Sequence, residues 1–296
     1  MKKQEYPLSV VIATLGGEVL RPTLAMLNSS EQIPAEILVC VPEKEAACMN
    51  NFGHENVRII VSPVRGQVAQ RAFGLKLARQ NFVMQMDDDI LIAPQSVRAL
   101  LHAAEALGQG SVVAPFFRHL SSGDYITRFP KGWRGWFDNL YLSAVCGAPW
   151  GIKRMGKLTP AGMGYWIDRD LIDDSPFETE WIPGGCALCR REDLVLDSYF
   201  PFPGKAFSED LIHSIYWRRQ GARLWGIPIA SCSTHVEPMP FVWRFMWADL
   251  RAHLHVVNLI KGSRTRLYAW FAVFLVKQTL LALRRTLSPR SENMRA

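Results

Sequence analysis

The sequence predicts an α/β fold in which a mostly parallel, twisted sheet is flanked by helices. Short β-branched apolar runs that end at Gly, Pro or polar residues predict strands at 8–13, 36–41, 57–61, 82–86 and 111–115. Apolar residues at helical spacing predict helices between these runs, at 20–27, 67–79 and 94–107. Because strand and helix alternate at short intervals, the chain is expected to form βαβ units and a largely parallel sheet.

The pattern becomes irregular in the middle of the chain. From about 116 to 181, Gly, Pro, Trp and charged residues are mixed without a period. Irregular stretches of this length usually carry function, so we expect loops that face a substrate. Two later apolar runs, at 186–190 and 224–230, predict further strands.

The charge of the chain is concentrated at its C-terminal end. The 296 residues include 34 Lys or Arg and 27 Asp or Glu, a formal net charge of +7. Residues 241–296 contain ten of the basic residues and two of the acidic ones, so the first 240 residues are almost neutral. A near-neutral body argues against a nucleic-acid-binding protein, and no nucleic acid is expected as a partner.

Aromatic and basic residues are interleaved in this C-terminal tail. The apolar run at 267–276, LYAWFAVFLV, is interrupted by Lys277 and is shorter than the roughly 20 residues of a membrane-spanning helix. Trp and Tyr favour the headgroup level of a membrane, and Lys and Arg favour anionic lipid. We therefore expect amphipathic helices that lie on an anionic membrane surface. A spanning or hairpin insertion and a plain buried helix remain alternatives.

The N-terminus carries no recognisable export signal. The apolar run at 8–13 is too short for the core of a signal peptide, and the charged residues before it end at Pro7. We therefore expect the protein at the cytoplasmic face of a membrane, the inner membrane of a bacterium, bound in a peripheral or monotopic manner.

Three consecutive carboxylates, Asp87, Asp88 and Asp89, directly follow the strand predicted at 82–86. Ligands of open α/β sheets bind at the carboxyl ends of strands, where adjacent carboxylates repel one another unless a cation relieves the repulsion. Mg²⁺ and Mn²⁺ prefer oxygen ligands and bridge substrate phosphates, so a metal site is one interpretation. An acidic turn that caps the next helix is the alternative.

Four segments together resemble family 2 glycosyltransferases of the GT-A type, which are inverting and contain a DxD motif. In chain order they are SVVIATLGGEVLRPTLAML, VRGQVAQRAFGLKLARQNFVMQMDDDI, WIPGGCALCRRED and FSEDLIHSIYWRRQGARLW. A DxD motif alone is weakly specific, but four motifs in this order over residues 8–236 are strong together. The resemblance implies a GT-A fold with a nucleotide-sugar-binding half at 1–118, an acceptor-binding and catalytic half at 119–240, and the membrane-associated tail at 241–296.

The resemblance also implies a metal ion at the acidic triplet. Asp87 and Asp89 correspond to the DxD pair and would hold Mg²⁺ or Mn²⁺ on the diphosphate of a nucleotide sugar, with Asp89 the more direct ligand. Asp88 is the variable middle position. His235 fits the late His that many GT-A enzymes recruit as a metal ligand, although a structural His is the alternative.

Further residues are expected to bind the donor nucleotide. Thr14 follows the strand predicted at 8–13, and together with Asp88 it is expected beside the donor. Arg71 would approach the nucleotide or its phosphates, unless it lies on a solvated helix face. Family members often carry an Asp after the second strand that contacts the base, and here Glu43 is the candidate substitute. The identity of the base therefore stays open between uridine, guanosine and deoxythymidine.

The resemblance implies that Asp210 is the catalytic base and Glu209 its neighbour. In an inverting transfer a carboxylate takes the proton of the acceptor hydroxyl, while cations stabilise the leaving diphosphate. The alternative is structural, because Ser208 would cap a helix whose first turn favours acidic residues. Gly184 and Gly185 would let the backbone approach the sugar or acceptor, or else form a turn.

Trp181 is expected to stack on a sugar ring of the acceptor, with a core position as the alternative. The interfacial tail favours a lipid-linked glycan or glycolipid acceptor, as in cell-envelope polysaccharide synthesis. The Gln-x-x-Arg-Trp element of processive synthases is missing, so we expect the transfer of a single sugar. Two other functions remain open: a catalytically silent GT-A domain acting as a membrane-bound scaffold subunit, and a nucleotidyltransferase.

Overall fold

The computed structural model describes residues 4–29, 32–47, 49, 52–236 and 242–287. The strands are β1 (Gln4–Ala13), β2 (Gln32–Pro42), β3 (Val57–Ser62), β4 (Phe82–Asp87), β5 (Leu91–Ile92), β6 (Ser111–His119), β7 (Lys157–Leu158), β8 (Gly164–Tyr165), β9 (Phe177–Thr179), β10 (Cys186–Arg190) and β11 (Arg223–Thr234). The helices are α1 (Leu20–Leu27), α2 (Glu43–Ala46), α3 (Gln67–Leu77), α4 (Pro94–Leu107), α5 (Gly132–Tyr141), α6 (Glu209–Arg219), α7 (Trp243–Leu259) and α8 (Arg264–Leu287). Short 3₁₀ or π turns are η1 (Leu142–Cys146), η2 (Gly151–Arg154), η3 (Arg169–Leu171) and η4 (Arg191–Asp193).

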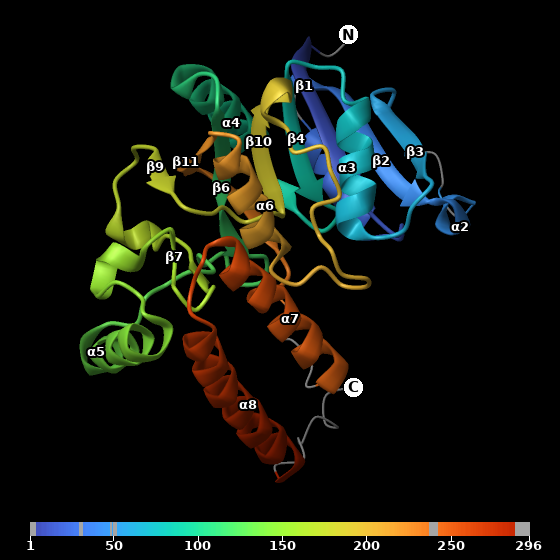
Figure 1. The fold of residues 1–296 in the computed structure, drawn as a ribbon. Helices are drawn as coiled ribbons and strands as arrows, with labels where there is room; N and C mark the ends of the chain where they lie inside the picture. The colour runs from blue at the N-terminus through green and yellow to red at the C-terminus, as the bar shows by residue number, and fades with distance from the viewer. Residues whose placement is uncertain (1–3, 30–31, 48, 50–51, 237–241, 288–296) are drawn as a thin grey trace, which may run out of the picture.

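The central sheet confirms the predicted α/β fold with a mostly parallel sheet. Its strand order is β3-β2-β1-β4-β10-β6-β11-β5, and β9 pairs with β11 (Figure 1). β1 is parallel to β2 and β4, β2 to β3, and β6 to β11, whereas β10 is antiparallel to both of its neighbours. Because β10 runs against β4, it begins where β4 ends, with Cys186 opposite Met86. The turn before β10 is thereby brought beside the acidic triplet.

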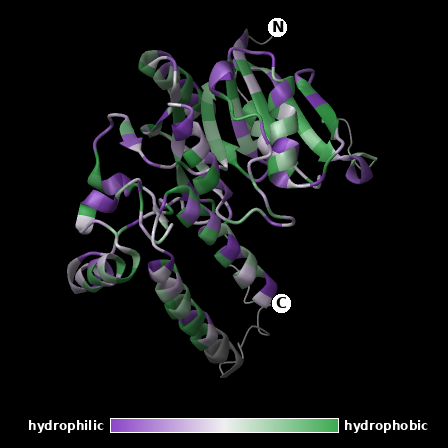
Figure 2. Cartoon of the chain, in the orientation of Figure 1, coloured by the Kyte–Doolittle hydropathy of each residue, from purple (hydrophilic) through white to green (hydrophobic). Residues whose placement is uncertain are grey.

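Alternate side chains of the strands enter two hydrophobic clusters, one on each face of the sheet. On β1, Val11 joins the cluster that contains side chains of α3 and α6, whereas Val10 and Ile12 join the cluster of α1 and α4. Successive side chains of a strand point to opposite faces, so a strand covered on both faces reads as a continuous apolar run. The result is three layers, helices on either side of a sheet whose strands are largely apolar (Figure 2).

The middle of the chain is more regular than the sequence predicts. Between 116 and 181, α5 and η1 follow one another, and β7 and β8 form a short antiparallel pair. The prediction of an irregular segment is therefore wrong for α5. Gly132, Gly135 and the charged residues around them interrupt its apolar positions and hide the helical period.

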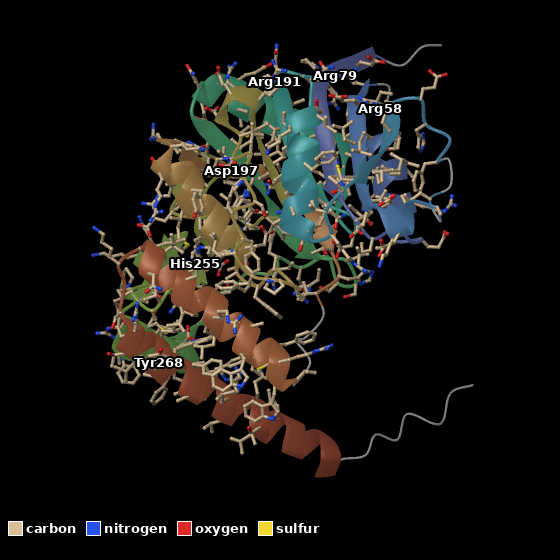
Figure 3. The ribbon with its side chains drawn as sticks, turned by 45° about the vertical axis from the view of Figure 1, so that its right-hand side comes forward. Arg58, Arg79, Arg191, Asp197, His255 and Tyr268 are labelled. Atoms are coloured by element: carbon tan, nitrogen blue, oxygen red, sulfur yellow. The ribbon has the colours of Figure 1, made fainter. Side chains whose placement is uncertain are left out.

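The predicted helical tail is present as α7 and α8, while residue 241 and residues 288–296 of that prediction lie outside the described part of the chain. A third hydrophobic cluster joins both helices to the segment around η1, and its buried members are Leu142, Cys146, Ala148, Ala161, Met163, Met246, Leu250, Val257, Leu267 and Phe271. Arg266 also donates to backbone carbonyls of η1. The two helices project from the end of the molecule opposite the N-terminus, where Figure 3 labels Tyr268 on α8. None of the helices in the described ranges is long and apolar enough to cross a membrane.

Candidate active site

The acidic triplet lies at the carboxyl edge of the sheet, where its members have separate partners. Asp88 accepts a hydrogen bond from the hydroxyl of Thr14, which follows β1. Asp89 accepts one of 3.0 Å from the hydroxyl of Thr234, the last residue of β11. β1 and β4 are parallel and end together, so the sheet topology itself gathers these side chains at one edge.

Arg71 on α3 joins the triplet to the start of α6. Its side chain is only 1% exposed, and its guanidinium donates to Asp87 Oδ1 at 2.7 Å and to the two carboxylate oxygens of Glu209 at 2.9 and 3.0 Å. The Tyr199 hydroxyl donates to Glu209 at 2.6 Å. Burial by itself lowers the pKa of Arg71, but the interactions with Glu209, Tyr199 and Asp87 together outweigh burial, and the pKa lies well above its usual value. The solvated-face alternative for Arg71 is therefore wrong.

Gly184 and Gly185 form a turn that packs directly against these carboxylates. A Cβ on Gly184 would lie 2.6 Å from Glu209 Oε1, and a Cβ on Gly185 would lie 3.1 Å from Asp87 Oδ2. The first distance is a steric clash, so the place of Glu209 requires a glycine at 184. The structure thus supplies a packing reason for both glycines, and their contact with a sugar stays a prediction.

Asp210 lies in the first turn of α6, beside Glu209. Its carboxylate accepts the backbone N–H of Leu211 at 2.9 Å, and burial, assisted by the charge of Glu209, raises the pKa of Asp210 to about 7. A carboxylate that titrates near neutral pH is suited to accept a proton. The capping interpretation of Ser208 is wrong, because its side chain caps no N–H and its hydroxyl instead lies 3.2 Å from His253 Nε2.

Two adjoining cavities lie along the acidic triplet. Asp88 lines the first, of about 600 Å³, and Asp87 and Asp89 line the second, of about 550 Å³. Gln67 and Lys205 line both, so the two spaces meet beside the triplet. Together they offer an elongated site with an amide and a cation where the two parts join.

A third cavity, of about 400 Å³, meets the second at Asp210. The body of the molecule contributes Trp181 and Tyr165 to its wall, and the tail contributes His253 from α7 and Trp270 from α8. Trp181 is 8% exposed and its Nε1 donates to the Tyr165 carbonyl at 3.2 Å, so most of its side chain is buried in the core. Stacking of Trp181 on a sugar stays a prediction, but the tail is a wall of the cavity that contains Asp210.

The oxygen ligands of the triplet fit a divalent ion that is shared with a substrate. In the described part of the chain, no group of three or more His, Cys, Asp or Glu side chains is arranged to hold a metal. His235 directly follows Thr234, the partner of Asp89, but its own side chain is exposed. Mg²⁺ is commonly held by one or two carboxylates and completed by substrate phosphates, and the role of Asp87 and Asp89 as its ligands stays a prediction.

The structure brings Thr14 to the first cavity but does not bring Glu43 there. Glu43 begins α2 with an exposed side chain, and among the described residues that line this cavity it does not occur. Thr14 is buried and lines the cavity beside Asp88. The contact of either residue with a nucleotide stays a prediction.

Three residues of the site were not predicted from the sequence. Gln67 donates to Asp87 Oδ1 at 3.0 Å, and the buried Gln70 donates to the backbone carbonyls of Thr14, just after β1, and of Cys40, near the end of β2. Lys205, an exposed residue of the loop before α6, lines both the first and the second cavity. Gln67, Gln70 and Arg71 have the spacing i, i+3 and i+4, and this polar stripe on a predicted helix is the signal that would have found two of them.

Comparison with solved structures supports the assignment of the fold. A crystal structure of GalNAc-T7 with UDP, GalNAc and Mn²⁺ matches with a TM-score of 0.55 and 15% identity over 80% of this chain. This chain spans 45% of the length of that one. A crystal structure of a mycobacterial protein matches with a TM-score of 0.50 and 15% identity, over 87% of this chain and 76% of that chain. At this identity, the likeness shows the fold alone.

A third match is glucosyl-3-phosphoglycerate synthase from Mycobacterium tuberculosis in complex with uridine-diphosphate, with a TM-score of 0.48 and 15% identity over 87% of this chain and 81% of that chain. No curated protein sequence matches the chain. A family model does: the model described as glycosyl transferase family 2 matches residues 10–158, half of the chain, from β1 to β7. The matched segment contains Arg71 and the acidic triplet. The motifs, the topology and the family match agree, and the chain belongs to glycosyl transferase family 2.

Proposed function

We propose that this chain is an inverting, metal-dependent glycosyltransferase that moves one sugar from a nucleotide-sugar donor to a membrane-proximal acceptor. The observation that carries the proposal is the place of Asp210. This carboxyl group, with its pKa raised to about 7, lies where a cavity lined by Asp87 and Asp89 meets a cavity built partly by the tail. A base is needed where donor and acceptor meet, and Asp210 is the titratable group at that junction.

The chemistry is a single displacement at the anomeric carbon of the donor sugar. Asp210 accepts the proton of the acceptor hydroxyl as the hydroxyl oxygen forms a bond to that carbon. The bond between the carbon and the phosphate oxygen breaks, and its electron pair leaves with the nucleoside diphosphate. Attack from the face opposite the leaving group inverts the configuration.

Arg71 acts as a positioning residue in this proposal. Its buried guanidinium binds Asp87 and Glu209 at once, so it fixes the distance between the donor side and the first turn of α6. Asp87 and Asp89 would hold Mg²⁺ or Mn²⁺, with His235 as a further candidate ligand, and the ion would neutralise charge on the leaving diphosphate. The UDP, GalNAc and Mn²⁺ in the GalNAc-T7 structure support a nucleotide sugar and a divalent ion. Lys205 adds a cation beside the same cavity.

The third cavity supports an acceptor that approaches from the tail. Its lining is mainly aromatic and apolar, with Trp181, Trp270 and Met163 around the carboxyl group of Asp210. Aromatic walls suit the apolar face of a sugar. Because α7 and α8 form one side of the cavity, the basic tail of 241–296 on an anionic membrane surface would bring a lipid-linked glycan or glycolipid to the base. This arrangement would hold the enzyme at the cytoplasmic face of the membrane.

The proposal is tested with a panel of UDP-, GDP- and dTDP-sugars, by measuring Mg²⁺- or Mn²⁺-dependent donor hydrolysis and transfer. Asp210→Asn should keep donor affinity and lose at least about 100-fold in turnover, because general-base catalysis contributes 10²–10⁴-fold. Asp197→Asn is the matched control, since Asp197 is an exposed carboxylate outside the three cavities (Figure 3). Wild-type turnover in Asp210→Asn would overturn the assignment of the base.

The metal is tested through donor binding rather than turnover. Calorimetry with UDP, or with the preferred nucleotide found in the panel, should show affinity that rises with Mn²⁺ in the wild type and does not rise in Asp89→Ala. Donor binding that needs no metal, and that Asp89→Ala leaves unchanged, would remove the metal from the proposal. Thermal unfolding of each variant checks that it is folded.

A further inference from the structure

Helix α5 is amphipathic, but its apolar face is exposed to solvent instead of being packed against the core. Its large apolar residues, Trp133, Trp136, Phe137 and Leu140, have the spacing i, i+3, i+4 and i+7 that places side chains on one helix face. In a helix of a globular protein this face normally covers the core. Here all four side chains are between 44% and 70% exposed.

The polar face of α5 is the one that attaches to the body. Asp138 forms an ion pair of 2.9 Å with Arg154, whose side chain is 2% exposed. The Asn139 side chain accepts the backbone N–H of Gly151 at 3.0 Å. These contacts hold the helix with its apolar face outward, so the exposure is a property of the packed fold and not of a loosely attached segment.

The neighbouring loop extends this apolar face. Trp150 and Ile152 flank Gly151, the residue that Asn139 binds, and both are about half exposed. We call the six residues Trp133, Trp136, Phe137, Leu140, Trp150 and Ile152 the α5 surface. α5 and the tail helix α8 lie at the same end of the molecule, away from the sheet (Figure 1). On α8, Val273, Val276 and Leu280 are exposed as well, so the apolar exposure is not confined to one element.

The exposed charged residues on α5 and in the segments that adjoin it in sequence are mainly basic. Lys131, Arg134 and Lys153 are exposed, and Asp138 is the sole acidic residue in the sequence from 125 to 167. Arg154 already neutralises Asp138. Two copies meeting through this surface about a two-fold axis would bring these cations together without carboxylates to pair with them. An anionic lipid layer instead offers an apolar interior for the aromatic rings and negative headgroups for the cations.

We propose that the α5 surface is a membrane-docking element that inserts its aromatic side chains into the interface of an anionic bilayer. It is separate in sequence from the basic tail and attaches to the body through its own buried ion pair. The assignment does not depend on the sugar-transfer chemistry. It predicts that membrane binding survives when Asp210 is replaced and is weakened when the α5 surface is made polar.

The test uses the full chain and co-sedimentation with vesicles of equimolar phosphatidylcholine and phosphatidylglycerol, and with vesicles of pure phosphatidylcholine. No donor or acceptor is present, so failure of the docking surface is distinguished from failure of the proposed enzyme activity. The triple variant Trp133→Ser, Trp136→Ser, Phe137→Ser should bind the anionic vesicles at least about tenfold more weakly than the wild type. Trp133→Phe with Trp136→Phe keeps the apolar area and should keep binding.

The matched control is the triple variant Val61→Ser, Val64→Ser, Ile229→Ser, which removes comparably exposed apolar residues elsewhere. It should bind vesicles as the wild type does, and thermal unfolding confirms that both triple variants fold. Wild-type vesicle binding by the α5 triple variant would overturn the proposal. So would a wild type that is dimeric without lipid and becomes monomeric in the α5 triple variant. Loss of binding only in Val273→Ser, Val276→Ser, Leu280→Ser would assign docking to α8 instead.

Discussion

Helices α3 and α5 have similar lengths and opposite relations to water. α3 buries its apolar residues Val68, Ala72 and Leu75 against the sheet, whereas α5 leaves its apolar stripe exposed. Each helix also pairs one charged side chain with charges of other segments, the buried Arg71 on α3 and the partly exposed Asp138 on α5. Apolar spacing therefore predicts a helix face but not what covers that face. The apolar face of α3 packs against the rest of the protein, and we infer that the apolar face of α5 packs against lipid.

The largest effect is expected from breaking the buried pair of α3. Arg71→Met leaves Asp87 and Glu209 without their shared cation, and breaking a buried ion pair from one side costs about 3–5 kcal/mol. Urea unfolding should show this loss of stability, and turnover should fall with it because the two carboxylates lose their fixed separation. Lys76→Met is the matched control, since Lys76 is exposed on the same helix. If Arg71→Met and the control have the same free energy of unfolding, the ion pairs of Arg71 with Asp87 and Glu209 do not stabilise the fold.

A smaller difference in stability is expected between substitutions in the apolar face of α3 and in that of α5. Leu75→Ala on α3 should reduce the free energy of unfolding by about 2–5 kcal/mol, because it leaves a cavity in the core. Leu140→Ala on α5 should change it by less than about 0.5 kcal/mol, because the side chain is already exposed to water. Both values come from urea unfolding without lipid. A large loss in Leu140→Ala would mean that α5 is covered by protein in solution, which contradicts the docking surface.

The smallest effect concerns pH. Because Asp210 must be unprotonated to accept a proton, its pKa of about 7 means that turnover should rise about tenfold from pH 6 to pH 8. Vesicle binding should stay constant over the same range, because Lys and Arg side chains remain charged. Initial rates at saturating donor, measured beside co-sedimentation at each pH, check both expectations. A flat rate profile would argue that a different group takes the proton.

The positions along the chain of strands β1, β2, β3, β4 and β6 and of helices α1, α3 and α4 were predictable from the sequence. Their apolar periods are uninterrupted and both faces of the sheet are covered, so local pattern and tertiary environment agree. The carboxyl edge was predictable as well, because the acidic triplet directly follows a strand that reads as fully buried. The family resemblance then placed Asp210 and Glu209 in the same site.

The role of Arg71 and the orientation of α5 were not predictable, for different reasons. The partners of Arg71 are 16 and 138 positions away, so no local pattern distinguishes a buried guanidinium from a solvated one. The apolar stripe of α5 is interrupted by Gly135 and by charged residues, and its exposure depends on the pair of Asp138 with Arg154. Glu43 was assigned by position alone, and the structure leaves it on the surface.

The backbone of Ser208 is left-handed, with φ of 51°, which costs a residue other than glycine on the order of 1 kcal/mol unless its surroundings hold it there. Its hydroxyl meets His253 of α7, and the other ring nitrogen of His253 lies 3.1 Å from the Gly162 carbonyl. The tail therefore contacts Ser208, two positions before Asp210. It also lines the cavity that contains Asp210. A chain that ends near Val236 would lack both the partner of Ser208 and one wall of the cavity that contains Asp210. Removal of the tail is therefore expected to reduce turnover even where no membrane is present.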